Sequence, residues 1–241
     1  MSESGSANAV GRPSVDRRGI IRWAVKQTVF LLILFAALFF SAGRYDGVRA
    51  WSYLGLVAFI QVLTAVILVP RSPELLIERS QLGAGVKTWD IFLAVLIGYS
   101  SALMALAAGL ETRFMALPAG LGVSLIVGII IAVVGTLLTL WAMLVNPFFS
   151  GIVRIQQERG HTVASTGPYQ YIRHPGYAGM LIFTYATPLI LGSIWSLGVA
   201  ILITGITILR TTLEDRTLQN ELEGYAAYAQ RVRYRLLPGI W

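Results

Sequence analysis

The 241-residue chain contains no cysteine, which excludes disulfide bonds, thiolate metal sites and a cysteine nucleophile. It has only two histidines, His161 and His174. These are too few for a histidine-rich metal centre, so we expect no bound metal. Charged residues make up only 13% of the chain, whereas hydrophobic residues make up 56%. This balance is typical of a protein that crosses a membrane several times rather than of a soluble domain.

Apolar sequence is abundant and falls into six runs, from which we expect an all-α, polytopic membrane bundle of about six transmembrane helices. Crossing the hydrocarbon core takes roughly 20 apolar residues. The second, third and fourth runs reach this length unaided, and the first does so if residues 23–27 are included. The last two are short and predict a helical hairpin. The runs are approximately Val29–Ala42, Trp51–Val69, Ile91–Leu110, Leu117–Val145, Tyr177–Leu191 and Ile194–Leu209.

The first run has a second interpretation. A basic N-terminus, about fourteen apolar residues and then Ser41, Ala42 and Gly43 also fit a cleaved signal peptide. We expect a retained helix, and the signal peptide stays open as the alternative.

The net charge of +7 is explained by its distribution. Six spans would place the N-terminus, the Pro70–Asp90 and Asn146–Pro175 loops and the C-terminal tail on one side. All but three of the nineteen Lys and Arg residues lie on that side; the exceptions are Arg44, Arg49 and Arg113. An excess of positive charge marks the cytoplasmic side. We therefore expect a cytoplasmic-membrane protein with both termini in the cytoplasm, and no nucleic-acid partner.

The chain is expected to fold as one unit with three parts. Residues 1–19 predict a disordered tail. Residues 20–145 predict a four-helix scaffold with almost no charge inside the membrane, where Gly120, Gly122, Gly128 and Gly135 suit close helix packing. Residues 146–241 carry most of the polar chemistry and predict the catalytic and cofactor-binding region.

The segment Thr211–Arg235 predicts an amphipathic helix at the cytoplasmic surface. Its apolar positions recur at helical spacing, while charged residues occupy the other faces. Such a helix either closes over a site or only lies on the membrane surface, and the pattern fits both roles. The apolar positions are Leu218, Leu222, Tyr225, Tyr228 and Val232.

The stretch GPYQYIRHPGYAGM, residues 167–180, is unusually polar and rich in turns for a sequence next to an apolar run. Gly167 and Pro168 predict a turn. Tyr169 and Tyr171 offer flat faces for a heteroaromatic ring, and Arg173 offers a fork of donors for a carboxylate or phosphate. Each tyrosine alone also fits a membrane-interface anchor, but the whole cluster favours a binding loop.

The second half of this stretch predicts a helix start that favours an anion. His174 precedes proline and is biased to an extended backbone. Pro175 suits the first turn of a helix, whose free N–H groups attract negative charge. Gly176 and Gly179 permit a close approach to the backbone. His161, six residues before Gly167, is a candidate to close the same pocket.

The segment His161, Gly167-Pro168-Tyr169, Arg173-His174-Pro175-Gly176-Tyr177-Ala178-Gly179 resembles the signature of the isoprenylcysteine carboxyl methyltransferase family. The family pattern is approximately H-x-x-V-x-x-G-x-Y followed by R-H-P-x-Y-x-G. Arg210, Glu214-Asp215 and the residues from Glu221 to Val232 also resemble that family's ending. The chain departs from the pattern at Ala164, where a larger hydrophobic residue is usual, and its last residues look more like prokaryotic members.

The resemblance implies methyl transfer from S-adenosylmethionine (SAM), bound in a pocket open to the cytosol, to a lipophilic acceptor that arrives from the bilayer. A carboxylate is the acceptor it favours. The matching positions put Arg210 and Glu214 on the acceptor side of the pocket; an ion pair along one helix face also explains their spacing. The cofactor-binding candidates are His161, Gly167, Tyr169, Arg173, His174, Pro175, Tyr177 and Gly179.

The sequence leaves other functions open. Related membrane enzymes that methylate phospholipid amines or thiols share short motifs of this kind. A sterol-type reductase would use NADPH, whose extra phosphates call for more basic residues than Arg173. A non-catalytic membrane protein or small transporter is a further class, although a transporter usually places ionisable groups or broken helices inside its spans.

Overall fold

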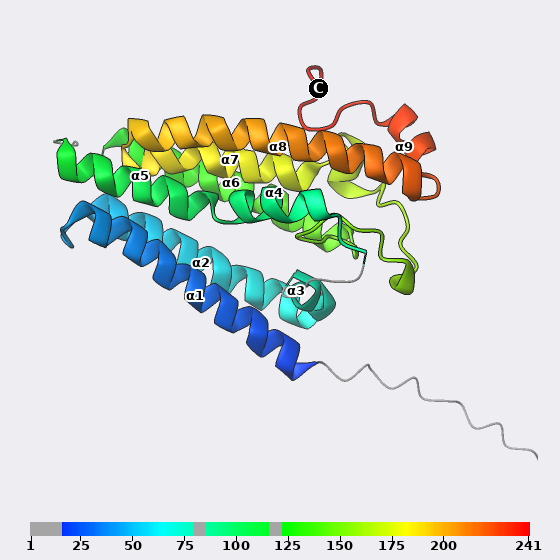
Figure 1. Ribbon diagram of the computed structural model, residues 1–241, viewed down its shortest axis with the longest axis horizontal. Helices are drawn as coiled ribbons and strands as arrows, with labels where there is room; N and C mark the ends of the chain where they lie inside the picture. Colours follow the sequence, from blue (N-terminus) through cyan, green and yellow to red (C-terminus); the bar gives the residue numbers. More distant parts are fainter. Residues whose placement is uncertain (1–15, 80–84, 116–121) are drawn as a thin grey trace, which may run out of the picture.

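The computed structural model describes residues 16–79, 85–115 and 122–241, and in these ranges the chain is helical with no strand. The long helices run roughly along one axis (Figure 1). Helix α3, the irregular segment after α6, and α9 gather at one end of this bundle. The signature stretch lies at that end.

Two long apolar helices open the described chain. Helix α1 covers Arg17–Ala42 and α2 covers Val48–Arg71, followed by the short α3, Pro73–Arg79. Helix α1 therefore starts well before the apolar run that predicted it and includes the last part of the expected tail. The rest of that tail, residues 1–15, lies outside the described residues.

The third apolar run, expected as one helix over Ile91–Leu110, is divided. Helix α4 covers Thr88–Gly98 and α5 covers Ser100–Phe114, and the two are bent by 43° at Tyr99. A glycine followed closely by two serines is a common cause of a kink, because serine hydroxyls compete for backbone groups and glycine adds freedom.

Helix α6, Val123–Val145, and α7, Pro175–Leu191, lie in very close contact. A Cβ atom added at Gly135 would lie 2.5 Å from the carbonyl oxygen of Gly179, and one at Gly128 would lie 2.8 Å from Ile190. Glycine thus lets the two backbones approach, as expected for a membrane bundle. Gly120 and the start of the predicted fourth run lie outside the described residues.

The predicted hairpin is present. Helix α7 ends at Gly192, which has a φ of +67°, and α8 covers Ile194–Glu221. Two charged side chains from the scaffold satisfy the backbone at this turn. Arg49 donates to the Ile190 carbonyl at the end of α7, at 3.0 Å, and the Glu111 carboxylate accepts from the first N–H groups of α8. Each charge has the sign that the nearby helix dipole favours.

The expected count of six spans is not confirmed. Among the described helices, α1, α2, α6 and α8 are long and apolar enough to cross a membrane, and the bent α4–α5 pair makes a possible fifth. Helix α7 has 17 residues and is shorter than these.

The predicted single helix over Thr211–Arg235 was wrong. Helix α8 continues to Glu221, the chain turns at Gly224 with a φ of +80°, and the short α9 covers Tyr225–Arg231. The apolar face was predicted correctly, but it packs on protein. Leu222, Tyr225 and Tyr228 form a buried cluster with Tyr169. The C-terminal segment therefore closes over the signature stretch.

Candidate functional site

A cavity of about 640 Å³ lies at the end of the bundle where α3, α9 and the signature stretch meet. Its size falls within the usual range for small-molecule sites. Seven of the ten candidate site residues line it, brought together from the segment after α6, from α7 and from α8. They are His161, Tyr169, Arg173, His174, Tyr177, Arg210 and Glu214.

The Arg173 guanidinium is held by the protein itself. It lies 3.0 Å from an oxygen of Asp215 on α8 and donates to the carbonyls of Ala229 and Val232 at 3.2 and 3.1 Å. Both Arg173 and Asp215 are buried. The sequence suggested that Arg173 binds a ligand carboxylate, but in the structure Asp215 takes that position.

Asp215 is the centre of a buried ionic cluster. His174 Nε2 lies 3.4 Å from Asp215, and Tyr225 and Arg235 each donate to it at 3.0 Å. The backbone N–H groups of Arg173 and His174 also donate to carbonyls of the C-terminal segment, both at 2.9 Å. This cluster fastens the extended turn before α7 to α8 and to the end of the chain.

The second buried ion pair joins the scaffold to the site. Arg210 donates to both oxygens of Asp90 at 2.6 and 2.9 Å. Asp90 also accepts from the Val153 N–H, and Arg210 donates to the Gly151 carbonyl. Arg210 is therefore neutralised by a residue at the start of α4 rather than by Glu214, and the same pair holds the segment after α6.

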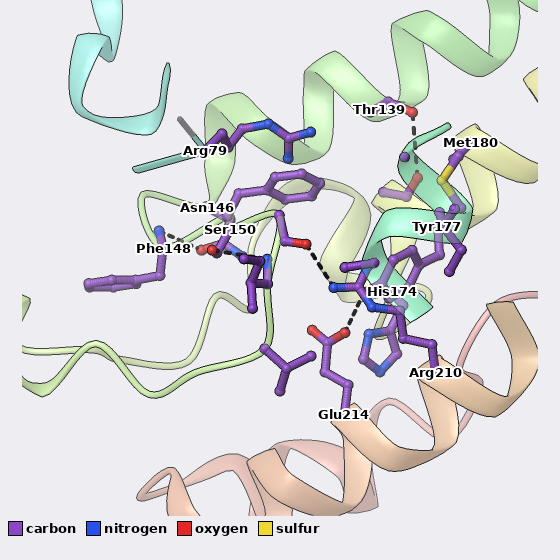
Figure 2. Close-up of a pocket in the computed structure, with 18 of the residues that line it drawn as sticks. Arg79, Thr139, Asn146, Phe148, Ser150, His174, Tyr177, Met180, Arg210 and Glu214 are labelled. Carbon is purple, nitrogen blue, oxygen red and sulfur yellow. Dashed lines mark hydrogen bonds between the residues drawn. The ribbon is translucent and has the colours of Figure 1, made fainter. Parts of the chain in front are cut away.

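Glu214 is partly buried and faces the cavity (Figure 2). The Tyr177 hydroxyl donates to its carboxylate at 2.5 Å. The Arg210 guanidinium carbon lies 5.4 Å from the centre of the Tyr177 ring, over its face. Such a contact is attractive, and it fixes the ring between the two charged groups. Arg210, Tyr177 and Glu214 thus form one surface beside the cavity.

His161 orders the loop that forms one wall. Its Nδ1 accepts from the Gln156 N–H at 3.2 Å, and its ring stacks on Phe148 at 4.5 Å. Burial, with the charges of Arg154 and Arg159, lowers the pKa of His161 to about 4. The ring is therefore neutral near pH 7, and it forms an aromatic surface rather than a charged one.

Tyr169 supplies a second aromatic surface. Its hydroxyl accepts from Asn146 at 3.1 Å, and its carbonyl accepts from the Tyr228 hydroxyl at 2.7 Å. Burial raises the pKa of Tyr169 far above that of a free phenol, so it stays protonated. Tyr171, in contrast, is 65% exposed and does not line the cavity.

Gly167, Pro175 and Gly179 are not among the residues that line the cavity. Gly167 has a φ of +55°, which favours glycine and gives the predicted turn. Pro175 begins α7, as expected. A Cβ atom on Gly179 would lie 2.5 Å from Thr139, so its open face contacts α6. The structure gives these three residues roles in shaping the backbone.

The cavity also has an apolar part that the sequence did not predict. It extends along α1, the α4–α5 bend and α7. A flexible hydrocarbon chain fits such a surface by removing apolar area from water. The apolar lining includes Phe30, Ile91, Ala94, Val95, Met180 and Phe183.

Comparison with known proteins agrees with this arrangement. Residues 123–223 match the family model described as Phospholipid methyltransferase. The family resemblance is confirmed over this region. The chain is 31% identical over 86 residues to Protein-S-isoprenylcysteine O-methyltransferase B of Arabidopsis thaliana, covering 35% of this chain and 44% of that protein. It is 32% identical over 66 residues to a probable protein-S-isoprenylcysteine O-methyltransferase of Oryza sativa subsp. japonica, covering 27% and 35%.

The chain therefore spans less than half the length of these curated relatives. The matched region contains all ten candidate site residues. Relatives that are methyltransferases imply a methyl donor, and several apolar helices indicate a multi-pass membrane protein. Within residues 16–79, 85–115 and 122–241, no group of three or more His, Asp or Glu side chains is arranged to hold a metal ion.

Proposed function

We propose that this protein is an integral membrane methyltransferase that moves the methyl group of SAM to a lipophilic acceptor, most favourably a carboxylate. One observation supports this above the others. A single cavity joins a polar wall, built by the signature residues, to an apolar surface on α1, α4 and α7. A water-soluble cofactor and a lipid substrate need such a junction if they are to react.

The residues of the polar wall fit the cofactor. Tyr169, Phe148 and the neutral His161 provide aromatic faces for the adenine ring. Arg173 and His174 hold this wall in place through Asp215, so we assign them positioning roles within the cofactor site. The sulfonium of SAM would supply an activated methyl group, whose carbon a nucleophile attacks in line with the departing sulfur.

A carboxylate acceptor needs no base. One of its oxygens forms the new C–O bond, the S–CH₃ bond breaks, and its electron pair returns to sulfur. The products are a neutral ester and a thioether, so opposite charges disappear during the transfer. A site shielded from bulk water favours this change, since water solvates the separated charges well. Holding the two reactants in line supplies several kcal/mol more.

The family model and Glu214 also support a second reaction, methylation of a phospholipid amine. The model's description names phospholipids. An amine must lose a proton when it is methylated, and Glu214 is a partly buried carboxylate beside the cavity that would accept it. Both reactions share the cofactor and the lipid side of the site.

The proposed orientation puts the cavity and both termini in the cytoplasm, where SAM is made, and the acceptor arrives from the bilayer. The positive-inside pattern supports this orientation. Among the described residues, Arg154, Arg173 and Arg210 line the cavity, and Arg235 donates to Asp215 beside it.

The test is incubation of the purified protein, in detergent or nanodiscs, with methyl-labelled SAM and a lipid extract, followed by base treatment. Label released by base identifies an ester and supports a carboxylate acceptor. Label that resists base and remains in phospholipid supports the amine reaction. No transfer of label to any lipid, from a protein that is folded and binds SAM, would contradict both.

A further inference from the structure

Arg79, the last residue of α3, projects into the cavity (Figure 2). Its guanidinium carbon lies 5.4 Å from the centre of the Phe149 ring. The side chain is exposed and lines the cavity, where the surrounding protein lowers the pKa of Arg79. An arginine in such a place remains charged near pH 7.

The other arginines that line the cavity have carboxylate partners. Arg173 pairs with Asp215, Arg210 pairs with Asp90, and Arg154 pairs with Glu78 and Glu158. Arg79 has no hydrogen bond or ion pair with any residue that the structure describes. Among the described arginines of this cavity, Arg79 is therefore the one that can pair with an anion entering from outside the chain.

The surroundings of Arg79 show which ligand brings that anion. The positive charge of Arg210 lowers the pKa of Arg79, in addition to the larger effect of burial. Arg79 lines the same cavity as the surface formed by Arg210, Tyr177 and Glu214 (Figure 2). That surface lies where the polar wall meets the apolar part of the cavity, which is where the head group of a lipid would rest.

We infer that Arg79 receives the anionic head group of the acceptor, while its hydrocarbon chain occupies the apolar part of the cavity. This inference rests on the proposed function and narrows it to acceptors that carry both a hydrocarbon chain and a negative charge. The carboxylate of an S-prenyl cysteine and the phosphate of a phospholipid share this chemistry. A guanidinium binds either of them through paired N–H groups.

Arg79→Gln tests the inference, because glutamine keeps donors but removes the charge. Arg79→Lys keeps the positive charge but lacks the paired N–H groups of a guanidinium. Arg71→Gln, at the exposed end of α2, is the matched control. For each protein in nanodiscs, three affinities are measured without turnover: for SAM, for an S-farnesyl cysteine with a free carboxylate, and for its carboxamide. Phosphatidylethanolamine is added as a competitor, to test whether the phosphate of a phospholipid binds at the same place as the carboxylate.

We expect Arg79→Gln to weaken binding of the carboxylate, or of the phospholipid, by at least about tenfold, the size of a lost charge-assisted hydrogen bond. SAM and carboxamide binding should change less than about threefold. Arg79→Lys should recover part of the loss, and Arg71→Gln should show none.

Three outcomes overturn the inference. In the first, SAM binding falls and neither acceptor is affected, which would place the cofactor's own carboxylate on Arg79. In the second, acid and carboxamide weaken equally, which indicates lost contact area rather than lost charge. In the third, no ligand responds. A wild-type protein that binds the acid through Arg79 but transfers no methyl group would contradict the proposed function and leave this anion site intact.

Discussion

The guanidinium of Arg173 lies 3.0 Å from the carboxylate of Asp215, 42 residues further along the chain, and both side chains are buried. This ion pair joins two parts of the family pattern. The signature supplies the cation, Arg173, and the start of the C-terminal ending supplies the anion, Asp215. A substitution in either half is expected to disturb the whole wall of the cavity.

Asp215→Asn is expected to destabilise the protein by about 3–5 kcal/mol, because it leaves the buried Arg173 without its counter-charge. SAM binding should weaken as well, although Asp215 is not among the residues that line the cavity. Thermal unfolding in detergent and SAM affinity measure the two effects. Glu223→Gln, at an exposed position just before the turn into α9, is the control, and equal stability of the two variants would contradict the prediction.

Glu214→Gln should spare SAM binding and reduce turnover at least about tenfold. The carboxylate holds the Tyr177 hydroxyl at 2.5 Å, and its loss removes a charge from the acceptor side without touching the aromatic wall. Steady-state kinetics together with SAM affinity separate these effects. Tyr177→Phe removes the same hydrogen bond and keeps the carboxylate, so it shows whether the bond or the charge matters. A fall in SAM affinity that matches the fall in turnover would refute this role.

Gly179→Ala is expected to destabilise the bundle by about 1–3 kcal/mol through overpacking. Its Cβ atom would meet Thr139 at 2.5 Å and the Gly135 carbonyl at 2.6 Å, both on α6. Gly198→Ala in α8 is the matched control, since nothing lies within 4 Å of its added Cβ atom. Unfolding midpoints in one detergent compare the two, and a Gly179→Ala protein as stable as the control would show that α6 and α7 are less tightly joined.

Acidification should loosen the cavity wall through His161. Its pKa is lowered to about 4 in the folded protein, from 6.5. The stability from keeping it neutral is therefore complete above about pH 6.5 and is lost as the pH falls toward 4. At pH 5 the loss is about 2 kcal/mol. Thermal unfolding at pH 7 and pH 5 should show this difference, and His161→Phe should reduce it. An unchanged pH dependence in His161→Phe would show that other groups cause it.

Sequence reasoning found the helices and the binding stretch because their signals are local. Apolar runs and turn residues predicted the order of helices. The signature predicted five residues that do line the cavity, and the C-terminal ending predicted two more. The partners of these residues were missed. Asp90 and Arg210 are 120 residues apart, and only the folded chain brings such distant charges together. Asp90 did carry a weak signal, as a carboxylate at the start of an apolar run.

The periodicity of the C-terminal segment predicted its apolar face but not its break. The helical spacing of Leu218, Leu222, Tyr225 and Tyr228 is kept in the buried cluster, yet Gly224 turns the chain between them. A glycine inside a helical pattern permits a break without requiring one. Arg79 was missed for a different reason, because an arginine in a loop resembles any other positive-inside residue until its surroundings are known.

The ion pair between Asp90 and Arg210 affects whether residues 123–223, which match the family model, could function without the helices that precede them. Residues 123–223 carry the signature, but Asp90 lies outside them and holds both Arg210 and the Val153 backbone. A fragment cut down to the shared region would contain a guanidinium enclosed in protein with its neutralising group deleted. Any chimera that grafts this region onto another set of membrane helices must therefore bring along an acid at the position of Asp90.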